Sequence, residues 1–167
     1  MFALACVNAR SEDSLEYDVK AGFLFNFTKF IQWPDDSFAE KSSPLVIGIL
    51  GADPFGEKFD QALEKEKSGG RRLVVKRYKS VQDIETCHIL FISAAERAHL
   101  PKVHEKLKDT STVVTGETDD FNREGGVIRF FLEKGRVRFE INVSAARRKK
   151  LEISSQLLNL ARIYREN

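Results

Sequence analysis

Short apolar runs separated by helical segments occupy the middle of the chain, and no other sequence feature constrains the fold as strongly. Residues 45–50 read LVIGIL, an almost continuous apolar run of the kind found in strands buried on both faces. Similar runs follow at residues 73–78, 88–93 and 112–115. Between them, amphipathic patterns predict a helix from Pro54 to about Lys67, a helical turn at 80–85 and a helix at 94–108. Strands that alternate with helices favour βαβ units and a parallel sheet.

The C-terminal part of the chain has a different pattern. Residues 127–132 and 136–143 are predicted strands, joined at 133–135 by a loop of hairpin length. In the second strand, apolar side chains alternate with Arg136, Arg138, Glu140 and Asn142, as in a half-buried antiparallel strand. A short helix at 145–149 and a final helix from Ser154 through Ile163 complete the prediction. The predicted fold class is α/β, with a mostly parallel sheet flanked by helices and a C-terminal antiparallel hairpin.

An aromatic helix is predicted at the start of the folded region, over residues 13–32. Val19, Phe23, Phe27 and Phe30 form one apolar stripe at helical spacing. Pro34 ends the helix, because the residue before a proline is driven out of the helical region. We assign four apolar residues to the core: Phe23, Phe27, Phe139 and Ile141.

The chain has 167 residues, which corresponds to one domain. Residues 1–12 are interpreted as the remnant of a signal peptide or as a disordered start, because Met1 to Val7 is apolar and Val7-Asn8-Ala9 has the small-x-small form that signal peptidases accept. Residues 13–167 are expected to form the single domain. No apolar stretch is long enough for a transmembrane helix, so the mature protein is not predicted to span a membrane.

No motif in the sequence predicts catalysis. Gly51 and Gly56 have the spacing of a phosphate-binding loop, but Glu57-Lys58-Phe59 follows where lysine and a hydroxyl residue are needed. Cys87 lies in an apolar run and is expected to be a buried thiol. We predict no metal site and no cofactor. With a net charge of +2, nucleic acid is not an expected ligand, and the basic run at 147–150 is either a solvated helix end or a docking patch for an acidic partner.

Six ordered sequence blocks resemble the YfiR-like family. The longest is KAGFLFNFTKFIQWP at residues 20–34. The others are residues 49–56, 87–93, 125–128, 137–142 and 151–158, so that the resemblance extends over about residues 18 to 163.

The resemblance implies a periplasmic α/β protein that tends to form a homodimer. It also implies repression of a membrane-bound diguanylate cyclase through that enzyme's periplasmic sensor domain, which lowers cyclic di-GMP and biofilm formation. Related domains are fused to sensor kinases. Family members often carry a cysteine in the first sheet strand, paired with the counterpart of Cys87, but here that strand reads Ile47-Gly48-Ile49. Redox control through this bridge is therefore not expected.

These observations predict a non-catalytic regulator that binds the sensor domain of a membrane signalling enzyme. Two surfaces are candidates for the partner: the end of the first helix, with Asn26, Lys29, Phe30 and Trp33, and the polar face of the hairpin, with Arg129, Arg138, Glu140 and Asn142.

Two alternatives stay open. The first is a small-molecule sensory domain acting with a sensor kinase; ligands of open α/β sheets bind beyond the carboxyl ends of the strands, which selects Gly51, Asp53, Ser93, Thr115 and Gly116. The second is a hydrolase, because catalytic triads need no adjacency in sequence.

Overall fold

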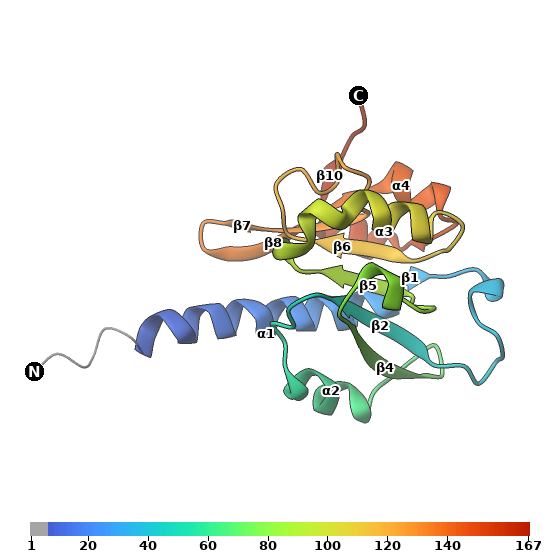
Figure 1. Ribbon diagram of the computed structural model, residues 1–167, viewed down its shortest axis with the longest axis horizontal. Coiled ribbons are helices and arrows are strands. Elements are labelled where there is room, and N and C mark those ends of the chain that lie inside the picture. The colour runs from blue at the N-terminus through green and yellow to red at the C-terminus, as the bar shows by residue number, and fades with distance from the viewer. Residues whose placement is uncertain (1–6) are drawn as a thin grey trace, which may run out of the picture.

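The computed structural model describes residues 7–167, with side chains from residue 12 onward, and its centre is a curled eight-stranded sheet (Figure 1). The strand order is β10-β8-β7-β6-β5-β2-β4-β3. In chain order the strands are β2 (Leu45–Leu50), β3 (Lys67–Ser68), β4 (Arg71–Tyr78), β5 (Ile89–Ile92), β6 (Val113–Gly116), β7 (Ile128–Glu133), β8 (Arg136–Asn142) and β10 (Arg162–Tyr164). All neighbouring pairs are parallel except β7–β8 and β3–β4. The predicted α/β class, mostly parallel sheet and antiparallel hairpin are confirmed.

Helices cover both faces of the sheet. They are α1 (Val7–Phe30), α2 (Glu57–Glu64), α3 (Leu100–Leu107), α4 (Val143–Arg148) and α5 (Ser155–Leu160), with short 3-10 helices η1 (Asp35–Ser37), η2 (Val81–Asp83) and η3 (Ala94–His99). Residues of α1, α2, α4 and α5 share one buried cluster with one side of the strands, whereas α3 shares a second cluster with the other side. The domain therefore has three layers, and the first part of α1 extends beyond the body of the protein (Figure 1).

The aromatic stripe of α1 fixes this helix to the hairpin. Phe27 is fully buried, and its ring centroid lies 5.8 Å from that of Phe130 and 5.2 Å from that of Phe139. Phe23 packs against the same rings from a partly buried position. Because aromatic pairs at such distances add to the hydrophobic gain of burial, the stripe determines which face of α1 points inward. The predicted core residues Phe23, Phe27, Phe139 and Ile141 all pack in this cluster.

Three predicted helix boundaries were wrong. α1 ends at Phe30 because Ile31 and Gln32 form β1 (Ile31–Gln32), which pairs antiparallel with β9 (Glu152–Ile153). α2 begins at Glu57 because the Asp53 carboxylate accepts hydrogen bonds from the backbone N–H groups of Phe55 and Gly56 and turns the chain before the helix. The same helix stops at Glu64, before the predicted end near Lys67, and β3 then makes a tight hairpin with β4.

The final predicted helix was the largest error. α5 ends at Leu160, and residues 162–164 form β10, parallel to β8. Among the apolar side chains of the predicted helix, Leu157 is buried, whereas Leu160 is 62 % and Ile163 is 40 % exposed. Backbone pairing with the free edge of β8 therefore outweighs the helical pattern of the side chains.

The N-terminal prediction lies partly beyond the structure. Residues 1–6, with Cys6, are outside the described residues, and residues 7–12 form the first turns of α1. Across residues 7–167, each helix is too short or too polar to cross a bilayer.

Candidate functional site

The end of α1 presents both exposed and buried members of the predicted partner surface. Asn26 and Lys29 are exposed, and the Lys29 ammonium lies 4.2 Å from the centroid of the Phe25 ring. Phe30 packs against the core. The Trp33 indole N–H donates a hydrogen bond to the carbonyl of His88 at 3.1 Å, which ties the segment after α1 to the residue before β5. Asn26 and Lys29 are thus free to contact a partner, while Phe30 and Trp33 hold the helix in place.

An apolar groove runs between α1 and α2, beside Asn26. Its volume is about 460 Å³, and its aromatic walls are formed by Tyr17, Phe25, Phe55 and Phe59. Gly22 lies in this groove, and a Cβ atom added to it would meet no other atom within 4 Å. Leu15 and Val19, also on α1, are 63 % and 47 % exposed. Apolar surface is therefore exposed on α1. The sequence interpretation assigned Phe23 and Phe27 of this helix to the core and did not predict the groove.

A cluster of charged and hydrogen-bonded side chains lies on the inner side of α1. The Tyr17 hydroxyl donates to Glu117 Oε2 at 3.0 Å, and the buried Lys20 ammonium pairs with Glu117 and Glu16. Burial, followed by the nearby Glu117 charge, raises the pKa of Tyr17. These interactions fix the rotation of α1 that exposes the groove.

The polar face of the hairpin is mostly internal, which differs from the expected exposed surface. Glu140 is 9 % exposed and Asn142 is fully buried. Glu140 Oε1 accepts hydrogen bonds from Arg129 Nε and Asn122 Nδ2, both at 3.2 Å. Asn142 caps α4 through the N–H of Ala145. Only Arg138 of the four predicted hairpin residues is well exposed, and it pairs with Glu133 at 2.9 Å.

The C-terminal tail is attached to this network. Glu166 Oε1 accepts a hydrogen bond from Asn142 Nδ2 at 3.0 Å, and both Glu166 oxygens bind the Arg148 guanidinium. The Arg148 hydrogen bond, followed by the one from Asn142, lowers the pKa of Glu166 to about 2. The network covers the outward side of β8, so the strict alternation in the sequence does not mark a solvated face.

The carboxyl ends of the parallel strands, where a sensory ligand was predicted, are filled by side chains. A Cβ atom on Gly51 would lie 2.6 Å from Glu96 Cγ, and one on Gly116 would clash with the ring of Phe121. Asp53 is held by Arg77 at 2.7 Å. This edge of the sheet is occupied by the protein itself.

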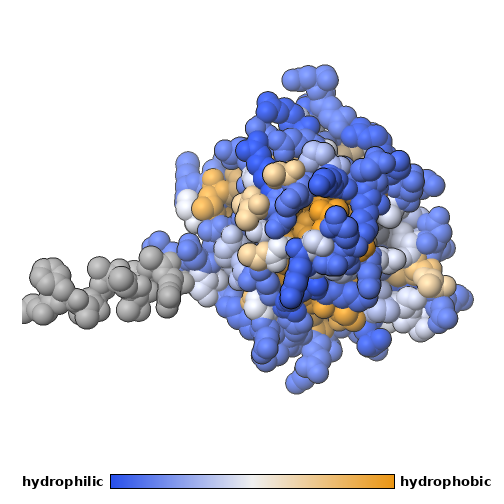
Figure 2. All heavy atoms as spheres, in the orientation of Figure 1, coloured by the Kyte–Doolittle hydropathy of each residue, from blue (hydrophilic) through white to orange (hydrophobic). Residues whose placement is uncertain are grey.

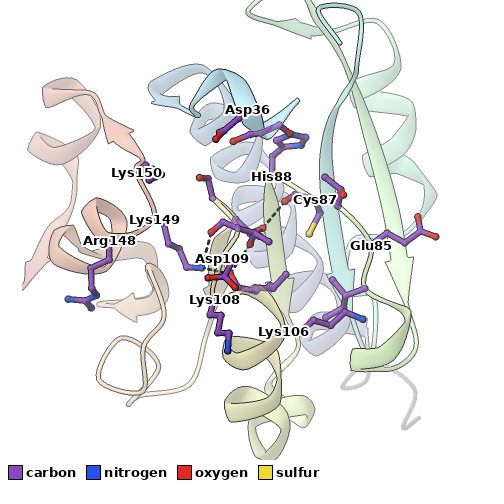
Figure 3. A pocket seen from close by; sticks show the side chains of 17 residues that line it. Asp36, Glu85, Cys87, His88, Lys106, Lys108, Asp109, Arg148, Lys149 and Lys150 are labelled. Atoms are coloured by element: carbon purple, nitrogen blue, oxygen red, sulfur yellow. Dashed lines mark hydrogen bonds between the residues drawn. The ribbon is translucent and has the colours of Figure 1, made fainter. Parts of the chain in front are cut away.

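A cleft of about 730 Å³ lies at the opposite edge, before the amino ends of β5 and β6 (Figure 3). Residues 36–37, 84–88, 106–112 and 148–150 line it. His88 forms part of its wall and is fixed from both ring nitrogens, since Nδ1 accepts the N–H of Val46 and Nε2 lies 3.0 Å from the carbonyl of Ser37. Burial lowers the pKa of His88, so the ring is neutral near pH 7. The basic run at 147–150, interpreted from the sequence as a helix end or a docking patch, contributes three of the lining residues. The cleft itself was not predicted, because its lining comes from four separate segments.

The groups usually associated with catalysis are separate or buried in the described residues. Cys87 is buried, as expected, and burial raises the pKa of its thiol to about 12. Between residues 7 and 167, no three His, Cys, Asp or Glu side chains gather as a metal site. In the same residues, no serine hydroxyl is hydrogen-bonded to a histidine ring, so the geometry gives the hydrolase alternative no support.

Comparison with known proteins gives one result that covers most of the chain. The family model described as "DUF4154: YfiR/HmsC-like" matches residues 17–162. A search of curated proteins finds no significant match.

Proposed function

The chain belongs to the YfiR/HmsC-like family, and from this premise we propose that it is a periplasmic regulatory protein that binds the sensor domain of a membrane signalling enzyme. The family is regulatory rather than catalytic. The enzyme proposed as partner is a diguanylate cyclase, which this protein would hold inactive, with lower cyclic di-GMP and less biofilm as the result. The match over residues 17–162 is the observation that carries the proposal.

The outer side of α1 is the surface we propose for the partner. Asn26 and Lys29 are exposed there, next to a groove with aromatic walls. Protein interfaces commonly combine buried aromatic anchors with a polar rim, and this surface offers both. The face drawn in Figure 2 is largely hydrophilic, with separate apolar areas, as in a protein that is soluble before it meets its partner.

Gly22 allows the surface to be tested without damaging the core. A leucine in its place fills the groove, because nothing lies within 4 Å of the Cβ position. Ala98→Leu is the matched control, since Ala98 is exposed in η3, on the segment leading into α3.

The experiment is capture of partners by the tagged, exported chain, combined with measurement of cyclic di-GMP after deletion of the gene. We expect the wild type and Ala98→Leu to capture a membrane diguanylate cyclase, and Gly22→Leu to capture much less. Cyclic di-GMP should rise on deletion and stay high when only Gly22→Leu is restored. Unchanged cyclic di-GMP, or capture of a histidine kinase instead, would overturn the diguanylate cyclase proposal.

The homodimer that the family resemblance implies is a separate proposal. Sedimentation equilibrium of the purified chain tests it, and a mass equal to 19.0 kDa at all concentrations would contradict it.

A further inference from the structure

The cleft at the amino ends of β5 and β6 contains a lysine, Lys149, whose ammonium is held by two backbone carbonyls. Lys149 Nζ donates to the carbonyl of Leu107 at 3.1 Å and to that of Thr110 at 3.4 Å. Leu107 is the last residue of α3, so the ammonium sits at the negative end of that helix. Lys149 forms no ion pair with any residue of the described chain. An ammonium has three donors, and these two carbonyls leave one for a ligand in the cleft.

The remaining charges favour an anion at this point. Lys106 and Lys150 also line the cleft without an ion pair among the described residues, whereas Lys108 and Arg148 are paired with acids outside it. The three lining acids, Asp36, Glu85 and Asp109, are all exposed. Water screens exposed charges more than partly buried ones. The electrostatic field inside the cleft is therefore dominated by half-buried Lys149.

Neutral polar groups complete the lining. The hydroxyl of Ser37 is buried and has no hydrogen-bond partner within the described chain. Thr110 and Thr112 share a hydrogen bond of 2.9 Å between their hydroxyls. Cys87 adds no negative charge, because its buried thiol stays protonated near pH 7, with a pKa of about 12. The walls are held by hydrogen bonds of His88 and Thr112, so the cleft is formed before a ligand enters.

We propose that this cleft binds a small molecule that carries a carboxylate or phosphate group, with Lys149 as the counter-ion of that group. Figure 3 shows Lys149 extending between the walls formed by α4 and α3. The site goes beyond the partner-binding role and involves other residues. It differs from the sensory alternative drawn from the sequence, which placed a ligand at the opposite edge of the sheet.

Calorimetric titration of the full purified chain with inorganic phosphate and with succinate tests the site and separates the two chemistries. We expect one of these probes to bind the wild type with one-to-one stoichiometry. Lys149→Met should weaken that binding by about tenfold, which is the loss of one charge-assisted hydrogen bond. Lys102→Met removes an exposed charge from α3 and should bind as the wild type does.

If Lys149→Met disturbs α3, a second measurement on the wild type still locates the binding site. Amide chemical shifts of the wild type, followed during the same titration, should move at residues 86–88 and 110–112 and stay constant at 51–53 and 93–96. Binding of neither probe would overturn the proposal, as would equal binding by all three proteins or shifts confined to the carboxyl edge. Partner capture plays no part in either measurement, so the result is independent of the proposed regulatory function.

Discussion

The end of α1 and the β7–β8 hairpin were both predicted to meet a partner, and the structure gives them opposite characters. On α1, Asn26 and Lys29 are exposed beside an apolar groove. On the hairpin, Glu140 and Asn142 are buried and bonded to Arg129, Asn122 and the C-terminal tail. Polar side chains at strand spacing can therefore belong to an internal network, while an aromatic side chain outside the buried stripe of α1, such as Phe25, can line a surface groove. The hairpin should therefore respond to mutation in stability, and α1 in partner binding.

The largest effect on stability is expected from Glu140→Ala. Removal of the carboxylate leaves Arg129, whose side chain is only 11 % exposed, without its buried counter-ion. Breaking a buried pair from one side costs about 3–5 kcal/mol. Urea unfolding measures the loss, and Arg138→Ala is the control on the same strand. A loss no greater than that of the control would mean that Glu140 is not part of a stabilising network.

A smaller loss, of about 1–2 kcal/mol, is expected from Tyr17→Phe, because the hydroxyl donates to the Glu117 carboxylate. The pH dependence has a defined sign. Since the pKa of Tyr17 is raised in the folded state, the wild type keeps its full stability below about pH 10 and loses it above. The advantage of the wild type over Tyr17→Phe should therefore be constant up to about pH 9 and shrink between about pH 10 and about pH 12. A constant difference across this range would contradict the proposed burial of the phenol.

Gly22→Leu should separate stability from binding. Glycine in a helix interior costs about 0.5–1 kcal/mol relative to alanine, so filling this position should leave the free energy of unfolding unchanged or slightly raised. Capture of the partner should fall by about tenfold, which corresponds to about 1.4 kcal/mol. Thermal unfolding and quantitative capture measure the two quantities. Normal capture by this stable variant would remove the groove from the interface.

The smallest effects are expected from Arg138→Ala. Its ion pair with Glu133 is exposed on both sides, and such pairs contribute about 0–1 kcal/mol. We expect stability within about 0.5 kcal/mol of the wild type and little change in capture. A strong loss of capture would show that the hairpin, through its one well-exposed predicted residue, belongs to the interface after all.

The sequence predicted the fold better than the site, for a physical reason. Continuous apolar runs such as residues 45–50 define buried strands locally, and the aromatic stripe through Phe23 and Phe27 defines the inner side of α1. The burial of Glu140 depends on Asn122 and Arg129, which reach it only through the fold. The cleft beside Lys149 likewise joins four separate segments. Strand β10 was missed because edge pairing with β8, and not side-chain periodicity, determines its conformation.

Site-specific photo-crosslinking of the exported chain shows directly whether α1 or the hairpin contacts the partner. A photoreactive residue is placed at Asn26 in one version of the full chain and at Arg138 in another, and both positions are exposed in the free protein. We expect the Asn26 version to crosslink to the periplasmic sensor domain of a membrane diguanylate cyclase, and the Arg138 version not to. Crosslinks to such a domain from Arg138 alone, or to no membrane signalling enzyme from either position, would contradict this expectation.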